Sequence, residues 1–353
     1  MRLVVVTQRV DPADPVLGAT VAKIGALAAR CDEVVVLTDS AVDGVLPGNC
    51  RVRLFAAGSR LGRGLRFEQA LAAELASRPR PAAVLAHMCP VYAVLAAPLA
   101  RPLGVRVMLW YAHWNRSRML EAAVRASSVV VSVDRRSVPI DSPKVVGIGH
   151  GIELDDFPCV ERQGARSLRA VALGRYSAAK GLGALVRGVA LARAAGLDVA
   201  LTCYGPTISA AEEENRAALE AQVAALGLDA AVRLEGPVAR PEVPGVLAAA
   251  DVLLNNMRSG APDKAVYEAC ATCCPVLVSN PLFDELLEGI EPPLLFPLDD
   301  AEALAERLSL LAALEQSSRA AVGRELRARV LERHSVGTWA EAIVRLAQES
   351  ASS

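Results

Sequence analysis

The 353-residue sequence lacks several features that mark particular classes of protein. Aromatic residues make up only 4 % of it, and it has only four histidines. The start Met-Arg-Leu-Val-Val-Val-Thr is too short for a secretion signal, and the longest apolar region, 81–107, is interrupted by Pro90, Pro98 and Arg101. Neither a G-x-G-x-x-G turn after the first predicted strand nor a Walker P-loop is present. We therefore expect a cytoplasmic protein and disfavour a dehydrogenase or a P-loop NTPase.

The net charge of −1 conceals an uneven distribution of charge. Residues 1–150 contain 19 Lys and Arg against 11 Asp and Glu, and the remainder carries the opposite excess. A basic first half and an acidic second half indicate surfaces for different partners. Neither half is basic enough for nucleic acid, and no recognition motif for it occurs.

Eight cysteines occur without an export signal, so we expect reduced thiols. The cluster Cys270-Ala-Thr-Cys273-Cys274 contains a C-x-x-C pair, which can bind zinc or carry out redox chemistry. A second pair and nearby histidines are missing, so small residues packed at a helix end are the preferred interpretation. An Asp-x-Asp metal motif is also missing, and we predict no metal.

Short β-branched runs alternate with Ala- and Leu-rich stretches, which predicts an α/β protein with two doubly wound parallel sheets and a ligand cleft between them. The predicted domains are 1–155 and 165–335, joined by a polar linker, and a C-terminal helix over 336–353 can return to the first domain. Predicted strands cover Leu3–Val6, Glu33–Leu37, Val52–Phe55, Ala83–Ala86, Arg106–Trp110, Val129–Ser132, Val145–Ile148, Arg169–Leu173, Ala200–Cys203, Val232–Leu234, Val252–Leu254 and Val276–Val278. Predicted helices cover Ala19–Arg30, Phe67–Ser77, Val91–Arg101, Arg118–Ala126, Gly183–Ala195, Ala210–Ala225, Pro241–Ala249 and Lys264–Ala271.

The segment Ala172–Gly181, ALGRYSAAKG, follows the first predicted strand of the second half. Gly174 allows a tight turn, and a helix is predicted to begin just after Gly181. Arg175 and Lys180 therefore lie at a strand end near a helix N-terminus, where an anion is favoured. Two solvated cations on a loop are the alternative.

A second segment, Ser259–Cys270, opens a helix whose first turns carry Asp263, Lys264 and Glu268. Because Lys264 and Glu268 are four residues apart, they share one helix face. They can form a simple i,i+4 ion pair, or they can present Lys264 to a phosphate and Glu268 to ribose hydroxyls.

Together these segments resemble a known enzyme family. The strings ALGRYSAAKG, CYGP, RLEGPV and AADVLLNNMRSGAPDKAVYEACATCCPVLVSN are similar to family 4 retaining glycosyltransferases of the GT-B fold. The first half fits as well, with DPADPVLGAT, AHMCPVYAVLAAPLARPLGVRVMLWYAHW and GHGIELDDF in order. The resemblance implies two Rossmann-like domains, the first for the acceptor and the second for the nucleotide-sugar.

The resemblance also assigns roles in donor binding. Arg175 and Lys180 match the pair that neutralises the donor diphosphate, and Glu268 matches the second glutamate of a Glu-x7-Glu motif. The first glutamate of that motif would fall at Gly260, and Asp263-Lys264 matches an SGxxDK…E variant seen in some branches. The donor-binding residues implied are Gly18, Gly174, Arg175, Lys180, Gly205, Asp263, Lys264 and Glu268.

Catalytic and acceptor residues come mainly from the first half. His113, in WYAHW, matches a histidine placed near the transferred sugar, although a histidine between aromatics is also typical of a packed core. Asp14 and His87 are candidates for the acceptor side. Glu68 and Glu74 lie on a predicted outer helix, so no carboxylate nucleophile stands out, which suits same-face retention. Asp11 and Asp14, in the loop after the first predicted strand, are the exception, and either one acting as a base would instead favour inversion.

Arg60, Arg63 and Arg66 alternate with Leu61, Leu65 and Phe67. Such a basic, apolar patch can sit on an anionic membrane, which would place the protein peripherally at the inner face of the membrane, or it can be a solvated loop.

The sequence thus predicts a transferase that moves a sugar from a nucleoside-diphosphate sugar to a hydroxyl acceptor, without metal or cofactor. The acceptor could belong to polysaccharide or glycolipid biosynthesis or be a small molecule, and it could be lipid-linked. A nucleotide-sugar epimerase of the same fold and a non-catalytic nucleotide-binding relative are the alternatives.

Overall fold

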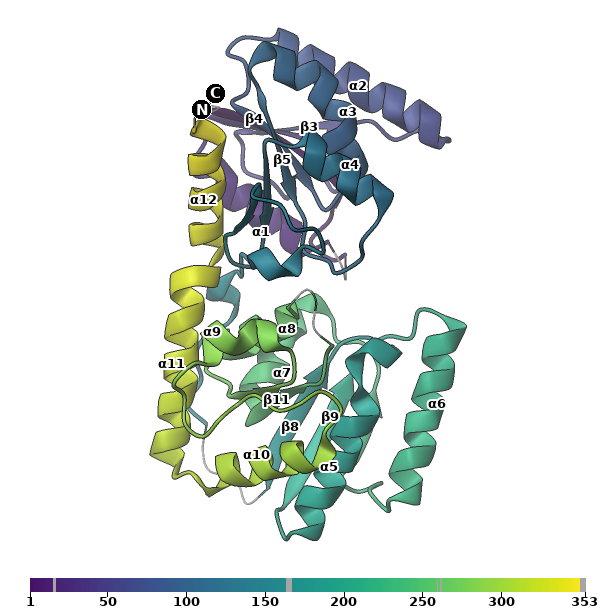
Figure 1. The fold of residues 1–353 in the computed structure, drawn as a ribbon, viewed down its shortest axis with the longest axis vertical. Helices are drawn as coiled ribbons and strands as arrows, with labels where there is room; N and C mark the ends of the chain where they lie inside the picture. The colour runs from purple at the N-terminus through teal and green to yellow at the C-terminus, as the bar shows by residue number, and fades with distance from the viewer. Residues whose placement is uncertain (15–16, 163–166, 259, 261, 350–353) are drawn as a thin grey trace. The chain divides into compact units, whose positions relative to one another are not determined.

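The computed structural model describes residues 1–14, 17–162, 167–258, 260 and 262–349. The chain divides into two compact units, Met1–Glu153 with Arg333–Ser353, and Leu154–Glu332 (Figure 1). Residues 163–166, in the predicted linker, lie outside the described ranges. No described helix is both long enough and apolar enough to cross a membrane.

The first unit is built on a parallel sheet of seven strands in the order β3-β2-β1-β4-β5-β6-β7. Its central strands are rich in valine and leucine because both faces are covered. The strands are β1 (Arg2–Val10), β2 (Glu33–Ala41), β3 (Cys50–Leu54), β4 (Ala83–His87), β5 (Arg106–Trp110), β6 (Val129–Ser132) and β7 (Val145–Gly147).

Helices cover both faces of this sheet. On one face, α2 (Arg60–Ala76), α3 (Pro90–Ala100) and α4 (Arg118–Ala126) pack on one buried core. On the other, α1 (Ala19–Ala28) packs against α12 (Val336–Gln348), and the ring of Trp339 in α12 meets Trp110 edge-on at 5.5 Å between centroids. The C-terminal helix is therefore part of the first unit.

The second unit is built on a parallel sheet of five strands in the order β10-β9-β8-β11-β12. Two parallel sheets with crossover helices confirm the predicted α/β class. Its strands are β8 (Leu168–Leu173), β9 (Val199–Tyr204), β10 (Val232–Glu235), β11 (Val252–Asn255) and β12 (Val276–Val278). Its helices are α5 (Leu182–Ala194), α6 (Ala210–Ala225), α7 (Val243–Ala249), α8 (Lys264–Ala271), α9 (Asp284–Leu287) and α10 (Ala301–Ala313), with most of α11 (Gln316–His334), whose last two residues belong to the first unit.

Helix α2 begins seven residues before its predicted start at Phe67. Ser59 caps it, and its hydroxyl accepts a hydrogen bond from the amide of Gly62 at 3.0 Å. The cap satisfies an amide that otherwise lacks a partner, and it offsets the poor helix propensity of Gly62 and Gly64. The solvated loop considered for this segment is therefore wrong.

Glu74 of α2 was expected on an outer helix, but its side chain is 1 % exposed. Its carboxylate pairs with Arg51 at 2.7 Å, with Arg53 at 2.5 Å and with Arg2. Burial alone would raise the pKa of Glu74, but the hydrogen bond and charge of Arg51, with Arg53 and Arg2, hold it below its ordinary value. Glu74 is a structural ion-pair residue.

The expectation that all thiols are reduced is also wrong in this structure, because Cys159 and Cys273 form a disulfide. These residues are 114 positions apart in sequence, so only the folded chain shows that they meet. Cys270 and Cys274 are free and fully buried. Within the described ranges, no group of three or more His, Cys, Asp or Glu is placed to hold a metal ion.

Candidate functional site

The turn after β8 carries the first group of candidate residues. Gly174 has a φ of 136°, and a Cβ there would lie 2.5 Å from Cε of Lys180. A glycine is favoured because residues with a side chain rarely adopt this φ, and the side chain of Lys180 lies close to this backbone. Gly181, with a φ of 51°, then leads into α5. The lysine is thus folded back onto the carboxyl end of β8.

Lys180 meets a residue from another element. Its ammonium pairs with Oδ2 of Asp263, and both side chains are about 15 % exposed. Asp263 caps α8, with Oδ1 accepting from the amide of Ala265 at 3.3 Å, while Oδ2 also accepts from Nδ2 of Asn255 at 2.7 Å. Two predicted donor-binding residues, 83 positions apart, therefore share one site.

Arg175 is held in the same way by a carboxylate that the sequence analysis missed. Its Nη1 donates to Oε1 of Glu212 at 3.0 Å, and Glu212 is buried in the first turn of α6. The other carboxylate oxygen accepts from the amide of Ile208 at 2.8 Å. The Ser209-x-x-Glu212 spacing is a capping-box pattern that could have drawn attention to this carboxylate.

Gly205 follows β9 beside this turn. A Cβ at this position would lie 1.9 Å from the carbonyl oxygen of Gly174, so no larger residue fits between the two strand ends. Packing alone therefore requires a glycine at position 205, and its predicted role in donor binding stays a prediction.

Glu268 lies one turn along α8 from Lys264, and the two form the i,i+4 pair expected as the simpler interpretation, at 2.9 Å. A second cation, Arg240, donates from Nη1 to the same Oε1 at 2.6 Å. The Glu268 side chain is 5 % exposed. Nothing in the sequence pattern indicated Arg240. Gly260, where the missing glutamate of the motif would fall, has a φ of 149°, and its neighbours Ser259 and Ala261 lie outside the described residues.

In the first unit, Gly18 and Asp14 lie in the loop between β1 and α1. The amide of Gly18 donates to the carbonyl of Asp14 at 2.9 Å, and a Cβ at Gly18 would lie 2.7 Å from that oxygen. The Asp14 carboxylate accepts from the amide of Leu17 at 2.8 Å and pairs with Arg9 at 3.2 Å. The neighbouring Pro15 and Val16 are outside the described residues.

β5 ends at Trp110, as predicted, and His113 is an exposed residue of the loop that follows it. Its Nδ1 accepts from the amide of Asn115 at 3.0 Å, and its ring stacks on Trp114 at 5.8 Å between centroids. The packed-core interpretation of His113 is therefore wrong.

His87, at the end of β4, is buried instead. Its ring is parallel to that of Trp110 at 6.4 Å, and within the described chain neither ring nitrogen has a hydrogen-bond partner. Burial, with a smaller contribution from the charge of Lys23, lowers the pKa of His87 well below its ordinary value, so the imidazole is neutral.

The basic segment forms the first two turns of α2. Arg63 pairs with Asp39 at 2.9 Å, and Arg66 donates to the carbonyl of Ala56 at 2.5 Å. Arg60 is exposed, as are Leu61 (83 %) and Leu65 (61 %).

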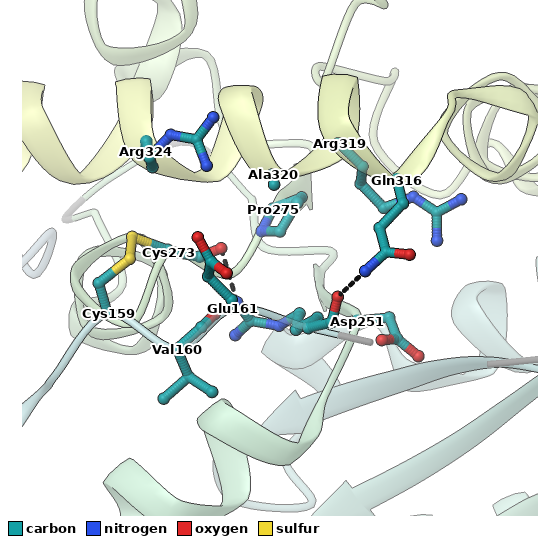
Figure 2. A pocket seen from close by; sticks show the side chains of 11 residues that line it. Cys159, Val160, Glu161, Asp251, Cys273, Pro275, Gln316, Arg319, Ala320 and Arg324 are labelled. Carbon is teal, nitrogen blue, oxygen red and sulfur yellow. Dashed lines mark hydrogen bonds between the residues drawn. A yellow bond between two sulfur atoms is a disulfide. The ribbon is translucent and has the colours of Figure 1, made fainter. Parts of the chain in front are cut away.

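A cavity of about 210 Å³ lies elsewhere in the second unit, with the Cys159–Cys273 disulfide on its wall (Figure 2). Asp251 and Pro275, which directly precede β11 and β12, also line it. These are the amino ends of parallel strands, whereas the candidate residues follow the carboxyl ends. The cavity is therefore distinct from the candidate site.

Residues 167–313 match the family model described as glycosyl transferases group 1. No curated protein sequence matches the chain.

Among solved structures, the chain is similar to the sucrose-phosphate synthase (tll1590) from Thermosynechococcus elongatus, with 19 % identity, 98 % of each chain covered and a TM-score of 0.74. Alr3699/HepE from Anabaena, in complex with UDP and glucose, shows 15 % identity over 98 % of this chain and 99 % of that one, with a TM-score of 0.74. A glycosyltransferase from Rickettsia africae ESF-5 shows 13 % identity over 99 % and 98 %, with a TM-score of 0.77. The chain thus has the GT-B fold, and residues 167–313 of its second unit match a group 1 glycosyl transferase domain.

Proposed function

We propose that the protein transfers a sugar from a nucleoside-diphosphate sugar to a hydroxyl acceptor. The observation that carries this proposal is the pair Arg175 and Lys180 at the carboxyl end of β8, inside the domain that matches the family. Glu212 and Asp263 hold the two cations in place. Fixed charges of this kind stabilise a diphosphate without a large cost in reorganisation.

In the proposed reaction, the bond between the anomeric carbon and the β-phosphate oxygen breaks, and a new bond forms to the acceptor oxygen. Negative charge develops on the leaving diphosphate, where Arg175, Lys180 and the N-terminus of α5 can stabilise it without metal or cofactor. The acceptor oxygen attacks the anomeric carbon from the face that the diphosphate leaves, so the configuration is retained, and the acceptor proton passes to the departing phosphate oxygen. If Asp14 were the base, the product would be inverted, and NMR of the product anomer separates the two.

UDP-sugars are the first donors to test. The solved structures of similar fold include Alr3699/HepE with UDP-glucose and an E. coli trehalose-6-phosphate protein bound with UDP-2-fluoro glucose. Glu268 is proposed to accept hydrogen bonds from the ribose, and Lys264 to face a phosphate. Gly18, Gly174 and Gly205 are proposed to let backbone approach the donor.

For the acceptor side, we propose His113 as the residue near the transferred sugar, with Asp14 and His87 lining the acceptor region. The exposed position of His113 is compatible with contact to a substrate. A polysaccharide, a glycolipid or a small molecule carries a suitable hydroxyl. Arg60, Arg66, Leu61 and Leu65 form an exposed basic and apolar surface that would suit peripheral contact with an anionic membrane.

A non-catalytic nucleotide-binding relative is the second candidate, favoured by Gly260. The first glutamate of the usual motif is replaced by this glycine, and the glycine has a φ of 149°, which glutamate rarely adopts. An epimerase would consume the same donor without any acceptor.

A thermal-shift screen with UDP, GDP, ADP and dTDP tests donor binding, followed by a donor-consumption assay with and without acceptor sugars. Stabilisation by one diphosphate and acceptor-dependent consumption support the transferase. Consumption without acceptor would indicate the epimerase, binding without consumption the non-catalytic relative, and no stabilisation by any diphosphate would contradict nucleotide binding altogether.

A further inference from the structure

The two oxygens of the Glu268 carboxylate have different surroundings. Arg240 and Lys264 both approach Oε1, at 2.6 and 2.9 Å. No hydrogen bond from any residue in the described part of the chain reaches Oε2. The Glu268 side chain, in which only Oε1 has partners within the described ranges, is 5 % exposed.

Arg240 comes from a different element than its partner. It opens the short turn Arg240–Glu242 that leads into α7, and α7 packs beside α8 (Figure 1). Its guanidinium lies 5.2 Å from the ring centre of Phe157, which is fully buried. The aromatic face and the carboxylate together define the position of the guanidinium, which is 25 % exposed.

A carboxylate in such a place needs a partner, because burying an unpaired charge is costly. Lys264 is on the same helix as Glu268 and has a flexible stem, so it fixes the rotamer of Glu268 poorly. A charge-assisted bond from a guanidinium that is itself held by packing fixes it much better. Arg240 therefore determines where Oε2 points.

We propose that Arg240 is a positioning residue that engages Oε1 of Glu268 and reserves Oε2 for a ribose hydroxyl, so that the site selects ribonucleoside over deoxyribonucleoside diphosphates. This rests on the proposed function, in which Glu268 binds the ribose. Losing the hydroxyl removes a hydrogen bond to a charged group whose side chain is only 5 % exposed, and a site built to bind a hydroxyl discriminates strongly against an analogue that lacks it.

The test compares Kd values for UDP, 2′-deoxy-UDP and 3′-deoxy-UDP by calorimetry, or the GDP or ADP series if the screen selects that base. The proteins are wild type, Arg240→Met, Arg240→Lys and Glu268→Gln, with Arg193→Met as the matched control. Arg193, on α5 of the same unit, pairs with Asp198, which directly precedes β9, and it lies outside the candidate site.

Wild type should prefer the ribonucleotide over at least one deoxy form by about tenfold or more. In Arg240→Met that preference should fall to about twofold, because UDP binds more weakly while the deoxy form changes little. Arg240→Lys should be intermediate, and Arg193→Met should match wild type. In turnover, Arg240→Met should raise the KM for the donor more than it lowers kcat.

Equal weakening of UDP and its deoxy forms in Arg240→Met would overturn the inference, since Arg240 would then act on the phosphates or on the fold. An unchanged preference would overturn it too. If Arg240→Met does not fold, Arg240→Lys decides by the same ratio. If Glu268→Gln keeps the wild-type preference for the ribonucleotide, the ribose role of Glu268 is contradicted. If no diphosphate binds to the wild-type protein, the proposed function is contradicted, and the inference with it.

Discussion

The carboxyl ends of the two sheets are built from different chemistry. In the second unit, Arg175, Lys180 and Glu268 are each joined to a partner from another element by an ion pair. In the first unit, His87 is buried against an indole ring, and His113 stands exposed in a loop. A diphosphate requires fixed positive charge, which is stable only when neighbouring carboxylates hold it. In the proposed function, the first unit meets acceptor hydroxyls, which are neutral and can be bound by fewer fixed charges.

The two units also differ in their histidine content. All four histidines, His87, His113, His150 and His334, belong to the first unit, and the second unit has none. Histidine is the side chain whose ordinary pKa lies closest to neutrality. The two histidines whose pKa is lowered by burial, His87 and His334, both belong to the first unit.

Among substitutions that test this difference between the two units, we expect the largest loss of activity at Lys180. Lys180→Met removes one fixed cation and leaves Asp263 with Asn255 and the α8 amide as partners. We expect kcat/KM to fall by about 10²- to 10³-fold, the range for removing one group that stabilises transition-state charge. Steady-state kinetics check this, with Arg193→Met as the control. A loss below about threefold would contradict the assigned role.

The next effect is expected at His113. Because the side chain is exposed, His113→Ala should leave the melting temperature unchanged, while kcat falls by about 10²-fold, as for loss of a group acting on the reacting sugar. Calorimetric Kd values for the donor nucleotide should not change. Arg116→Ala, in the same loop, is the control. Weaker nucleotide binding in His113→Ala would contradict a role restricted to the transferred sugar.

A smaller effect concerns acid stability. Burial, together with the charge of Arg333, lowers the pKa of His334 from 6.5 to about 4. Below pH 6.5 the unfolded chain binds the proton more readily than the folded one, so stability falls as the pH drops from about 6.5 to about 4. His334→Gln should reduce this fall by about 1–2 kcal/mol. Chemical denaturation at pH 7 and pH 5 measures it, and an equal fall in both proteins would refute the assignment.

The smallest effect is expected at the exposed end of α2. The double change Leu61→Ser and Leu65→Ser should alter the melting temperature by about 1 °C or less, since both side chains are exposed. Binding to phosphatidylglycerol vesicles should weaken, whereas Leu226→Ser in the second unit, also exposed, should have no effect. Equal vesicle binding by all three proteins would exclude membrane contact through this surface.

Most of the secondary structure could be predicted because it depends on local periodicity. β5, β6, α4, α6 and α8 have the predicted bounds. The start of α2 was missed because Gly62 and Gly64 argue against a helix, whereas Ser59 caps it and Gly64 packs near Leu95. The low helix propensity of these glycines destabilises the helix less than the cap and the tertiary packing stabilise it.

The sequence alone determined the α/β alternation, the position of Arg175 and Lys180 after a strand, and the pairing of Lys264 with Glu268. Each of these depends on residues within a few positions of one another, where helix and strand geometry fix what is adjacent. Only the tertiary structure decided that Glu212 holds Arg175, that Asp263 holds Lys180 and that Arg240 holds Glu268. Those partners are 28 to 83 residues apart, and the order of strands in the sheet, which no local pattern encodes, brings them together.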